Sequence, residues 1–241
     1  MIDDALSIEE LMKEVSETIR SHVDLYLIGG GAMMCLGSKS YTKDLDLVVY
    51  SEEEYNAILD VLDELGFERD RPTEGMKRTN LSEILKKEEY RIDLFAKRIC
   101  GKLQLSDTMM FRATIRFESD NVRLHTRSAE DIFLLKSITE REGDIDDCNR
   151  LLLYSPRFDW DAFIKELEVQ MGFGDAVWVT YVVERLLALG IDSRFPDVFN
   201  SVSMIEKEYL EHWAVRRNNP MYRICPVFVI NAPLLIARWA I

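Results

Sequence analysis

The pattern of apolar and polar positions predicts strands alternating with helices over the first 126 residues. Short runs rich in aliphatic and aromatic residues have the length of buried strands, and polar or glycine-containing turns separate them. The predicted strands cover residues 25–28, 44–50, 90–95, 111–117 and 122–126. Because the segments between them carry helical periodicity or turn residues, we expect a mixed sheet with flanking helices.

Helices are predicted where apolar residues recur every three or four positions. Ser7 followed by Glu10 has the pattern of a capping box and predicts a helix start. Ser51 and Ser128 are expected to cap two further helices. Residues 159–215 are predicted to be mainly helical.

Pro156 marks the domain boundary that we predict. The α+β domain covers residues 1–155, and a mainly helical domain with an apolar tail covers residues 156–241. The tail, residues 224–241, is interrupted by prolines and polar side chains, which favours a packed strand or tail over a membrane-spanning helix.

Cysteine spacing and the first residues predict the compartment. The cysteines are far apart without a CxxC pair, which favours reduced thiols, and the N-terminus lacks the features of a signal peptide. We therefore expect a cytoplasmic protein with no membrane partner.

Charge changes the range of expected partners. The 241 residues include 30 Lys+Arg and 43 Asp+Glu, a net charge of −13, which argues against a broadly basic surface for nucleic acid. A local basic strip remains, formed by Arg112 and Arg116 on one predicted strand and by Arg123 and Arg127 on the next segment. This strip has two interpretations, contact with a phosphate backbone or pairing with the many acids.

Three acids form the candidate chemistry. Asp44 and Asp46 open one predicted strand and point to the same face, and Asp93 lies within another strand between Ile92 and Leu94. Carboxylates gathered on one sheet face repel each other unless cations neutralise them. Hard oxygen ligands suit Mg²⁺ or Mn²⁺, and a pair of such ions serves phosphoryl transfer.

A glycine turn accompanies the acids. Gly29, Gly30 and Gly31 follow the first predicted strand, where the absence of side chains lets the backbone approach a phosphate. Each motif is common alone, but the order strand, glycine turn, short helix, Asp-x-Asp strand, helix and later Asp is informative.

The combination resembles the nucleotidyltransferase fold of the DNA polymerase β superfamily. The carrying segments are Leu27-Ile-Gly-Gly-Gly-Ala-Met-Met, Gly37-Ser38, Tyr41-Thr-Lys-Asp-Leu-Asp-Leu-Val-Val49 and Arg91-Ile-Asp-Leu-Phe95. Arg127-Ser-Ala-Glu-Asp-Ile-Phe-Leu-Leu-Lys136, with Arg141 and residues 144–147, resembles the helices of AbiEii-type and related small prokaryotic nucleotidyltransferases. The resemblance covers about residues 20–153.

The resemblance implies metal-dependent transfer of a nucleoside monophosphate from a nucleoside triphosphate, such as ATP, to an acceptor hydroxyl. Asp44, Asp46 and Asp93 would be the catalytic metal ligands, with Asp93 beside the acceptor hydroxyl. The implied nucleotide-binding residues are Gly29, Gly30, Gly31, Ser38, Lys43 and Lys136. Asp144 or Asp147 would orient the helices or a base.

The acceptor remains open between an RNA end such as tRNA, a protein side chain and a small molecule. An RNA acceptor would suit a toxin with an antitoxin partner. An aminoglycoside-type enzyme for a cationic small molecule is the alternative, and the acidic net charge favours it. A binding module without catalysis is a further alternative, because Ser40 stands where related proteins often carry Arg four residues before the first Asp.

Overall fold

A computed structural model of the protein describes residues 5–70, 83–88, 90–139 and 141–218. Its strands are β1 (Val23–Ile28), β2 (Leu45–Val49), β3 (Glu68–Arg69), β4 (Glu83–Lys87), β5 (Tyr90–Ala96), β6 (Arg98–Ile99), β7 (Leu103–Gln104), β8 (Thr114–Glu118) and β9 (Val122–Thr126). Its helices are α1 (Ala5–Thr18), α2 (Gly29–Cys35), α3 (Glu52–Glu64), α5 (Asp107–Arg112), α6 (Ala129–Ser137), α7 (Gly143–Tyr154), α8 (Trp160–Met171), α9 (Val179–Ala188), α10 (Ile191–Arg194) and α11 (Pro196–Asn218).

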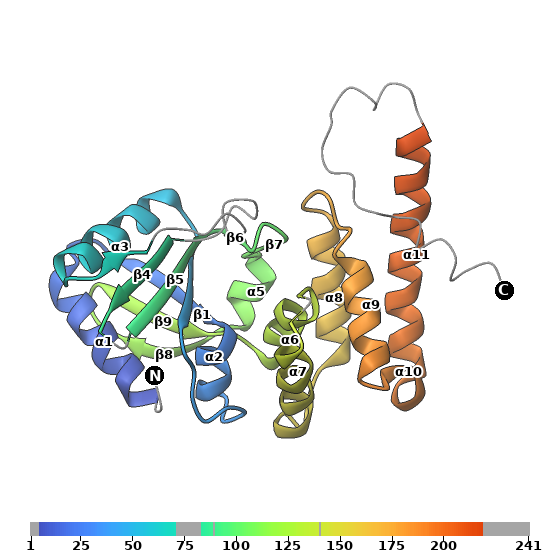
Figure 1. The fold of residues 1–241 in the computed structure, drawn as a ribbon, viewed down its shortest axis with the longest axis horizontal. Helices are drawn as coiled ribbons and strands as arrows, with labels where there is room; N and C mark the ends of the chain where they lie inside the picture. Colours follow the sequence, from blue (N-terminus) through green and yellow to red (C-terminus); the bar gives the residue numbers. More distant parts are fainter. Residues whose placement is uncertain (1–4, 71–82, 89, 140, 219–241) are drawn as a thin grey trace.

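The main sheet is mixed, as predicted. Within the described residues its strand order is β3-β4-β5-β2-β1-β9-β8. β1 is antiparallel to β2 and parallel to β9, and β2 is parallel to β5. α1 and α3 pack together against the sheet, with the C-terminal helices at the other end of the molecule (Figure 1). The predicted α+β class with helices after the sheet is confirmed.

The period of two in β2 decides which residues form the core. Leu45 and Leu47 are buried, whereas Asp46 between them points to the opposite face and is only partly buried. A register shift of one residue would move the acid into the apolar layer, so the pattern fixes the pairing.

Local capping explains where α3 and α6 begin. Ser51 accepts from the Glu54 N–H while the Glu54 side chain accepts from the Ser51 N–H, which completes a capping box. Ser128 accepts from the Asp131 N–H at the start of α6. Both predicted caps are confirmed.

Two local predictions are wrong, and one strand was not predicted. Ser7 lies inside α1 and is not its cap, because the helix already includes Ala5. Residues 111–113 are not a strand, since Ser106 caps α5 and the helix continues to Arg112 before β8 starts at Thr114. Residues 83–87, which lie outside the predicted strands, form β4.

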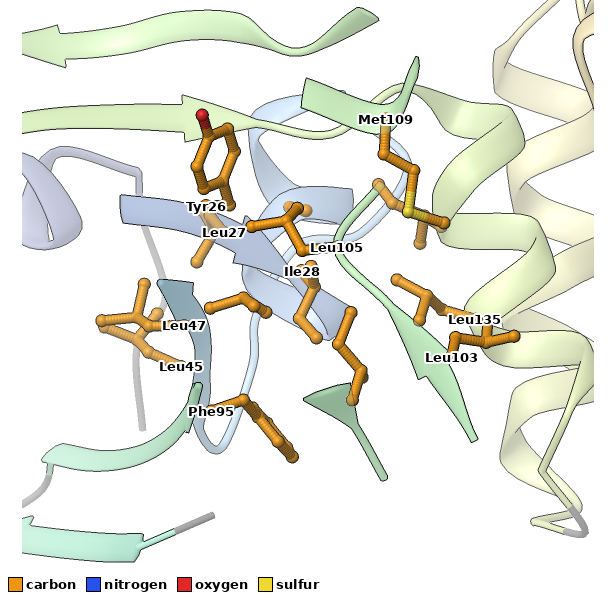
Figure 2. Packing of buried hydrophobic residues seen from close by; sticks show 14 of the residues in the cluster. Tyr26, Leu27, Ile28, Leu45, Leu47, Phe95, Leu103, Leu105, Met109 and Leu135 are labelled. Atoms are coloured by element: carbon orange, nitrogen blue, oxygen red, sulfur yellow. The ribbon is translucent and has the colours of Figure 1, made fainter. Parts of the chain in front are cut away.

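Apolar side chains join the sheet to α6. Leu103 and Leu105, on and just after β7, lie with Met109 of α5 and Leu135 of α6 close to Ile28 at the end of β1 (Figure 2). All of these side chains are buried, and α6 also contacts α2. The orientation of α6 relative to β1 is therefore fixed by a continuous core.

The other side of α6 packs on the C-terminal helices. Phe133 makes edge-on contacts with Trp160 and Phe163, so α6 belongs to an aromatic cluster that includes α8. The boundary at residue 155 stays a prediction.

The predicted tail at residues 224–241 lies outside the described residues. Every helix in the described part of the chain is too short or too polar to cross a membrane.

Candidate functional site

The site is built where three neighbouring strands meet the first glycines of α2. Ile28, the last residue of β1, is the register partner of Asp46 in β2, and Asp46 is the register partner of Asp93 in β5. Register partners point to the same face of a sheet. Asp44 lies two residues before Asp46, directly ahead of β2.

The charges of Asp44 and Asp93 act on Asp46. Burial raises the pKa of Asp46 to about 7, and the negative charges of Asp44 and Asp93 act in the same direction. The positive charges of Lys136 and Arg141 oppose the rise in pKa. Asp46 therefore lies in a locally anionic site that a cation would stabilise.

Gly29 makes room for this carboxylate. It has a φ of +61°, and a Cβ added to it would lie 2.0 Å from Asp46 Oδ2. Any side chain at this position would collide with the acid, so the glycine gives the carboxylate a place beside the start of α2. Gly30 has a similar function for the following loop, because its Cβ would lie 2.3 Å from Thr42 Oγ1.

Thr42 is a residue that sequence reasoning missed. Its buried hydroxyl donates to the backbone carbonyl of Asp44 at 2.9 Å. This bond closes a local turn before Asp44, and the Thr42 hydroxyl lies beside Gly30 of α2. The signal was present in the Thr42-Lys-Asp44 spacing, which is typical of a local side-chain turn.

Asp93 is engaged by a neighbour on its own strand. Arg91 Nε donates to Asp93 Oδ1 and Arg91 Nη2 donates to Asp93 Oδ2, both at 3.0 Å. Burial nevertheless raises the pKa of Asp93 above its ordinary value, with Arg91 opposing the rise. Among the described residues, no three His, Cys, Asp or Glu side chains are arranged to hold a metal ion.

The donor chemistry still fits a divalent cation. Carboxylate oxygens are the ligands that Mg²⁺ and Mn²⁺ prefer, and the Asp46 carboxylate lies in the space that the absent Cβ of Gly29 leaves. A metal that used Asp93 would first have to displace Arg91.

Lys136 reaches the site from α6. Its Nζ donates to Asp144 Oδ1 at 2.7 Å and forms an ion pair with Asp147 Oδ2 at 2.9 Å. Asp147 also binds Lys39, with both carboxylate oxygens 2.9 Å from Lys39 Nζ. Lys39 is a second residue that the sequence left without a role, since its partner is 108 residues away.

The other predicted nucleotide-binding residues differ in position. Gly31 is buried in the first turn of α2 against Leu27 and Leu45. Ser38 is buried, and its hydroxyl donates to the Met33 carbonyl at 3.0 Å, which ends α2. Lys43 is exposed in the loop before β2. Their roles toward a nucleotide stay predictions.

Arg141, in the segment before α7, carries a positive charge that acts on the acids. Its charge lowers the pKa of both Asp46 and Asp93, so it lies near them, and its side chain is exposed. The motif around Lys136 included this residue without giving it a function.

The basic strip is not a free cationic surface. Arg112 lies in α5 rather than on a strand, with Nη2 2.5 Å from Asp131 and 2.6 Å from Glu166. Arg127 is 1% exposed and lies over the Tyr26 ring. Arg116 pairs with Glu9, and Arg123 pairs with Glu118 and Asp24. Pairing with acids is the correct interpretation of Arg112, Arg116 and Arg123, whereas Arg127 is buried without an ion pair among the described residues. The predicted shared strand face of Arg112 and Arg116 is wrong, because Arg112 lies in α5.

Comparison with known proteins identifies the family of this chain. A family model described as nucleotidyl transferase of unknown function (DUF2204) matches residues 7–191. No curated protein matches the chain.

Two solved structures of one protein show low similarity. A crystal structure of ANT(2″)-Ia in complex with adenylyl-2″-tobramycin has 12% identity and a TM-score of 0.41, and covers 85% of this chain and 98% of that one. A solution structure of the antibiotic-resistance factor ANT(2″)-Ia has 10% identity and a TM-score of 0.44, and covers 89% and 97%. These scores are too low to support an argument about substrate.

Proposed function

The chain belongs to the DUF2204 family of nucleotidyl transferases of unknown function, and from this premise we propose that it moves a nucleoside monophosphate from a nucleoside triphosphate to an acceptor hydroxyl in a metal-dependent reaction. In this reaction the acceptor oxygen bonds to the α-phosphorus, the bond from that phosphorus to the bridging oxygen breaks, and pyrophosphate leaves.

One observation carries the proposal. Asp46 and Asp93 are register partners on adjacent strands, and the charge of Asp44 acts on Asp46 from the same face. Such a cluster is unfavourable in water-poor surroundings without a cation. Divalent ions held there would neutralise the phosphate charge and clamp the attacking and leaving oxygens.

The chain's own groups have separate tasks in this scheme. Asp44 and Asp46 would hold a metal ion that neutralises phosphate charge, while Gly29 leaves space for the Asp46 carboxylate and Gly30 leaves space for the Thr42 hydroxyl. Asp93 accepts the proton of the acceptor hydroxyl, a task helped by burial that raises its pKa. Lys136 supplies positive charge from α6.

Surface charge favours a small cationic acceptor over RNA. The arginines expected to contact a phosphate backbone are paired with acids or buried, and the net charge is −13. An acidic surface raises the local concentration of a cationic substrate.

The test is transfer of label from nucleoside triphosphates. The full chain is incubated with α-labelled ATP, GTP, CTP or UTP, with Mg²⁺ or with EDTA, and with tRNA, mixed protein or aminoglycosides as separate acceptors. We expect Mg²⁺-dependent labelling of one class, with the aminoglycosides favoured. Labelling of tRNA instead would support the toxin alternative.

The matched variants separate chemistry from general acidity. Asp44→Ala with Asp46→Ala should lower the rate by about a thousandfold or more, because the metal supplies several kcal/mol. Asp60→Ala with Glu64→Ala removes two exposed acids of α3 and should leave the rate unchanged. Unchanged transfer by the first variant would show that the metal site is assigned wrongly.

A further inference from the structure

Two lysines from distant parts of the chain share one carboxylate beside the candidate site. Lys39 follows α2, Lys136 lies in α6 and Asp147 lies in α7. Asp147 Oδ2 is 2.9 Å from each Nζ, so the two ammonium groups lie within twice that distance of each other. Like charges this close are costly unless an anion lies between or beside them.

Within the described residues, each ammonium group has one N–H donor without a protein acceptor. An ammonium group has three donors. Lys39 directs two contacts to the two oxygens of Asp147, and Lys136 directs one to Asp144 and one to Asp147. Among the described residues no third acceptor is present for either group, so each is held in place with one donor left for a ligand.

The pair adjoins the acids and glycines of the site. Lys136 is near enough to Asp46 for its charge to lower the pKa of that carboxyl. The side chain of Lys39 passes Gly30, with Cδ 4.0 Å from the position a Cβ would take. The side chain of Lys39 is 26% exposed although it is paired with Asp147, so a ligand in solution can reach it.

From this arrangement we propose that Lys39 binds the phosphate chain of the nucleotide together with Lys136, and that Asp147 is the positioning residue that orients both ammonium groups. The inference rests on the proposed nucleotidyl transfer, and it assigns Lys39 and Asp147 to the phosphate subsite. A polyphosphate provides the additional anionic oxygens that the paired ammonium groups lack.

Binding measurements on the full chain test the proposal. Calorimetry with Mg²⁺ compares ATP, pyrophosphate and AMP for the wild type, Lys39→Met, Lys39→Arg and Asp147→Asn. Lys39→Met should lower the affinity for ATP and for pyrophosphate about tenfold, which corresponds to the loss of one charge-assisted hydrogen bond. The affinity for AMP should stay unchanged. Lys39→Arg should recover most of the affinity. Asp147→Asn should also weaken the binding of pyrophosphate. This loss should depend less on salt concentration than the loss caused by Lys39→Met.

Controls separate this proposal from folding and from the proposed function. Lys13→Met removes an exposed lysine of α1 and should bind like the wild type. If Lys39→Met is unstable, Lys39→Gln and Lys39→Arg are compared at matched folded fraction. If Lys39→Met or Lys39→Gln binds pyrophosphate with the affinity of the wild type, the proposed role of Lys39 is overturned. A wild type that binds neither ATP nor pyrophosphate with Mg²⁺ would instead overturn the proposed function.

Discussion

The carboxylate of Asp46 occupies the space in which the side chain of residue 29 would lie. Because a Cβ on Gly29 would be 2.0 Å from Asp46 Oδ2, this backbone position and this acid are mutually dependent. The site thus needs a glycine for steric reasons in addition to the φ of +61°.

Gly29→Ala is expected to abolish metal-dependent ATP binding, since the new Cβ forces Asp46 away from its place. Gly66→Ala is the control, because Gly66 has a φ of +84° with nothing within 4 Å of the added Cβ. Both variants should lose about 1–2 kcal/mol from the left-handed backbone alone. Calorimetry and urea unfolding measure the two effects. Similar ATP affinities in the two variants would contradict the steric argument.

Arg91→Met is expected to tighten Mn²⁺ binding. Arg91 occupies both oxygens of Asp93, and its removal frees them for the metal. A partly exposed ion pair is worth about 0.2–1 kcal/mol, so affinity should rise by up to about fivefold. Electron paramagnetic resonance measures free Mn²⁺. Arg69→Met, which breaks a surface pair with Asp63, should bind normally, and weaker binding by Arg91→Met would show that Arg91 supports the metal site.

Arg112→Met is expected to destabilise the protein by about 3–5 kcal/mol. Arg112 bridges Asp131 and Glu166, whose side chains are 0% and 1% exposed, and its loss leaves two buried carboxylates without this cation. Arg116→Met breaks an exposed pair with Glu9 and should cost about 1 kcal/mol or less. Urea unfolding compares them. Equal losses would mean that the buried bridge contributes no more than a surface pair.

Asp131 gives a pH dependence of stability. Burial raises the pKa of Asp131 from 3.8 to about 6, although Arg112 opposes the rise. The folded protein therefore retains a proton that the unfolded chain releases, so this carboxyl's stabilisation is complete below about pH 4 and is lost as the pH rises through 6. The unfolding free energy of the wild type should fall more over this interval than that of Asp131→Asn. If the unfolding free energies of the two proteins change in parallel with pH, the raised pKa of Asp131 is contradicted.

The central strands were predictable because their signals are local. β1, β2, β5 and β9 are short apolar runs, and Asp46 interrupts one of them at the period of two. The same period predicts that Asp44 and Asp46 point to one face of the sheet.

The missed elements show where local signals conflict. Ile84 and Leu85 are buried in β4, but the surrounding charges concealed the strand. Phe111 has high strand propensity and is 91% exposed in α5, because the cap at Ser106 determines the local structure. The pairing of Lys39 with Asp147 depends on how α7 packs, which no local pattern encodes.

The strand order also bears on how the chain is made. Val23 in β1 pairs with Val122 in β9, so one edge of β1 stays open until the ribosome has synthesised residues 122–126. A sheet of β1, β2 and β5 alone would have an unpaired edge at β1, and unpaired strand edges favour association with other chains. The strands that carry the site acids therefore depend on a segment far along the chain to complete their sheet.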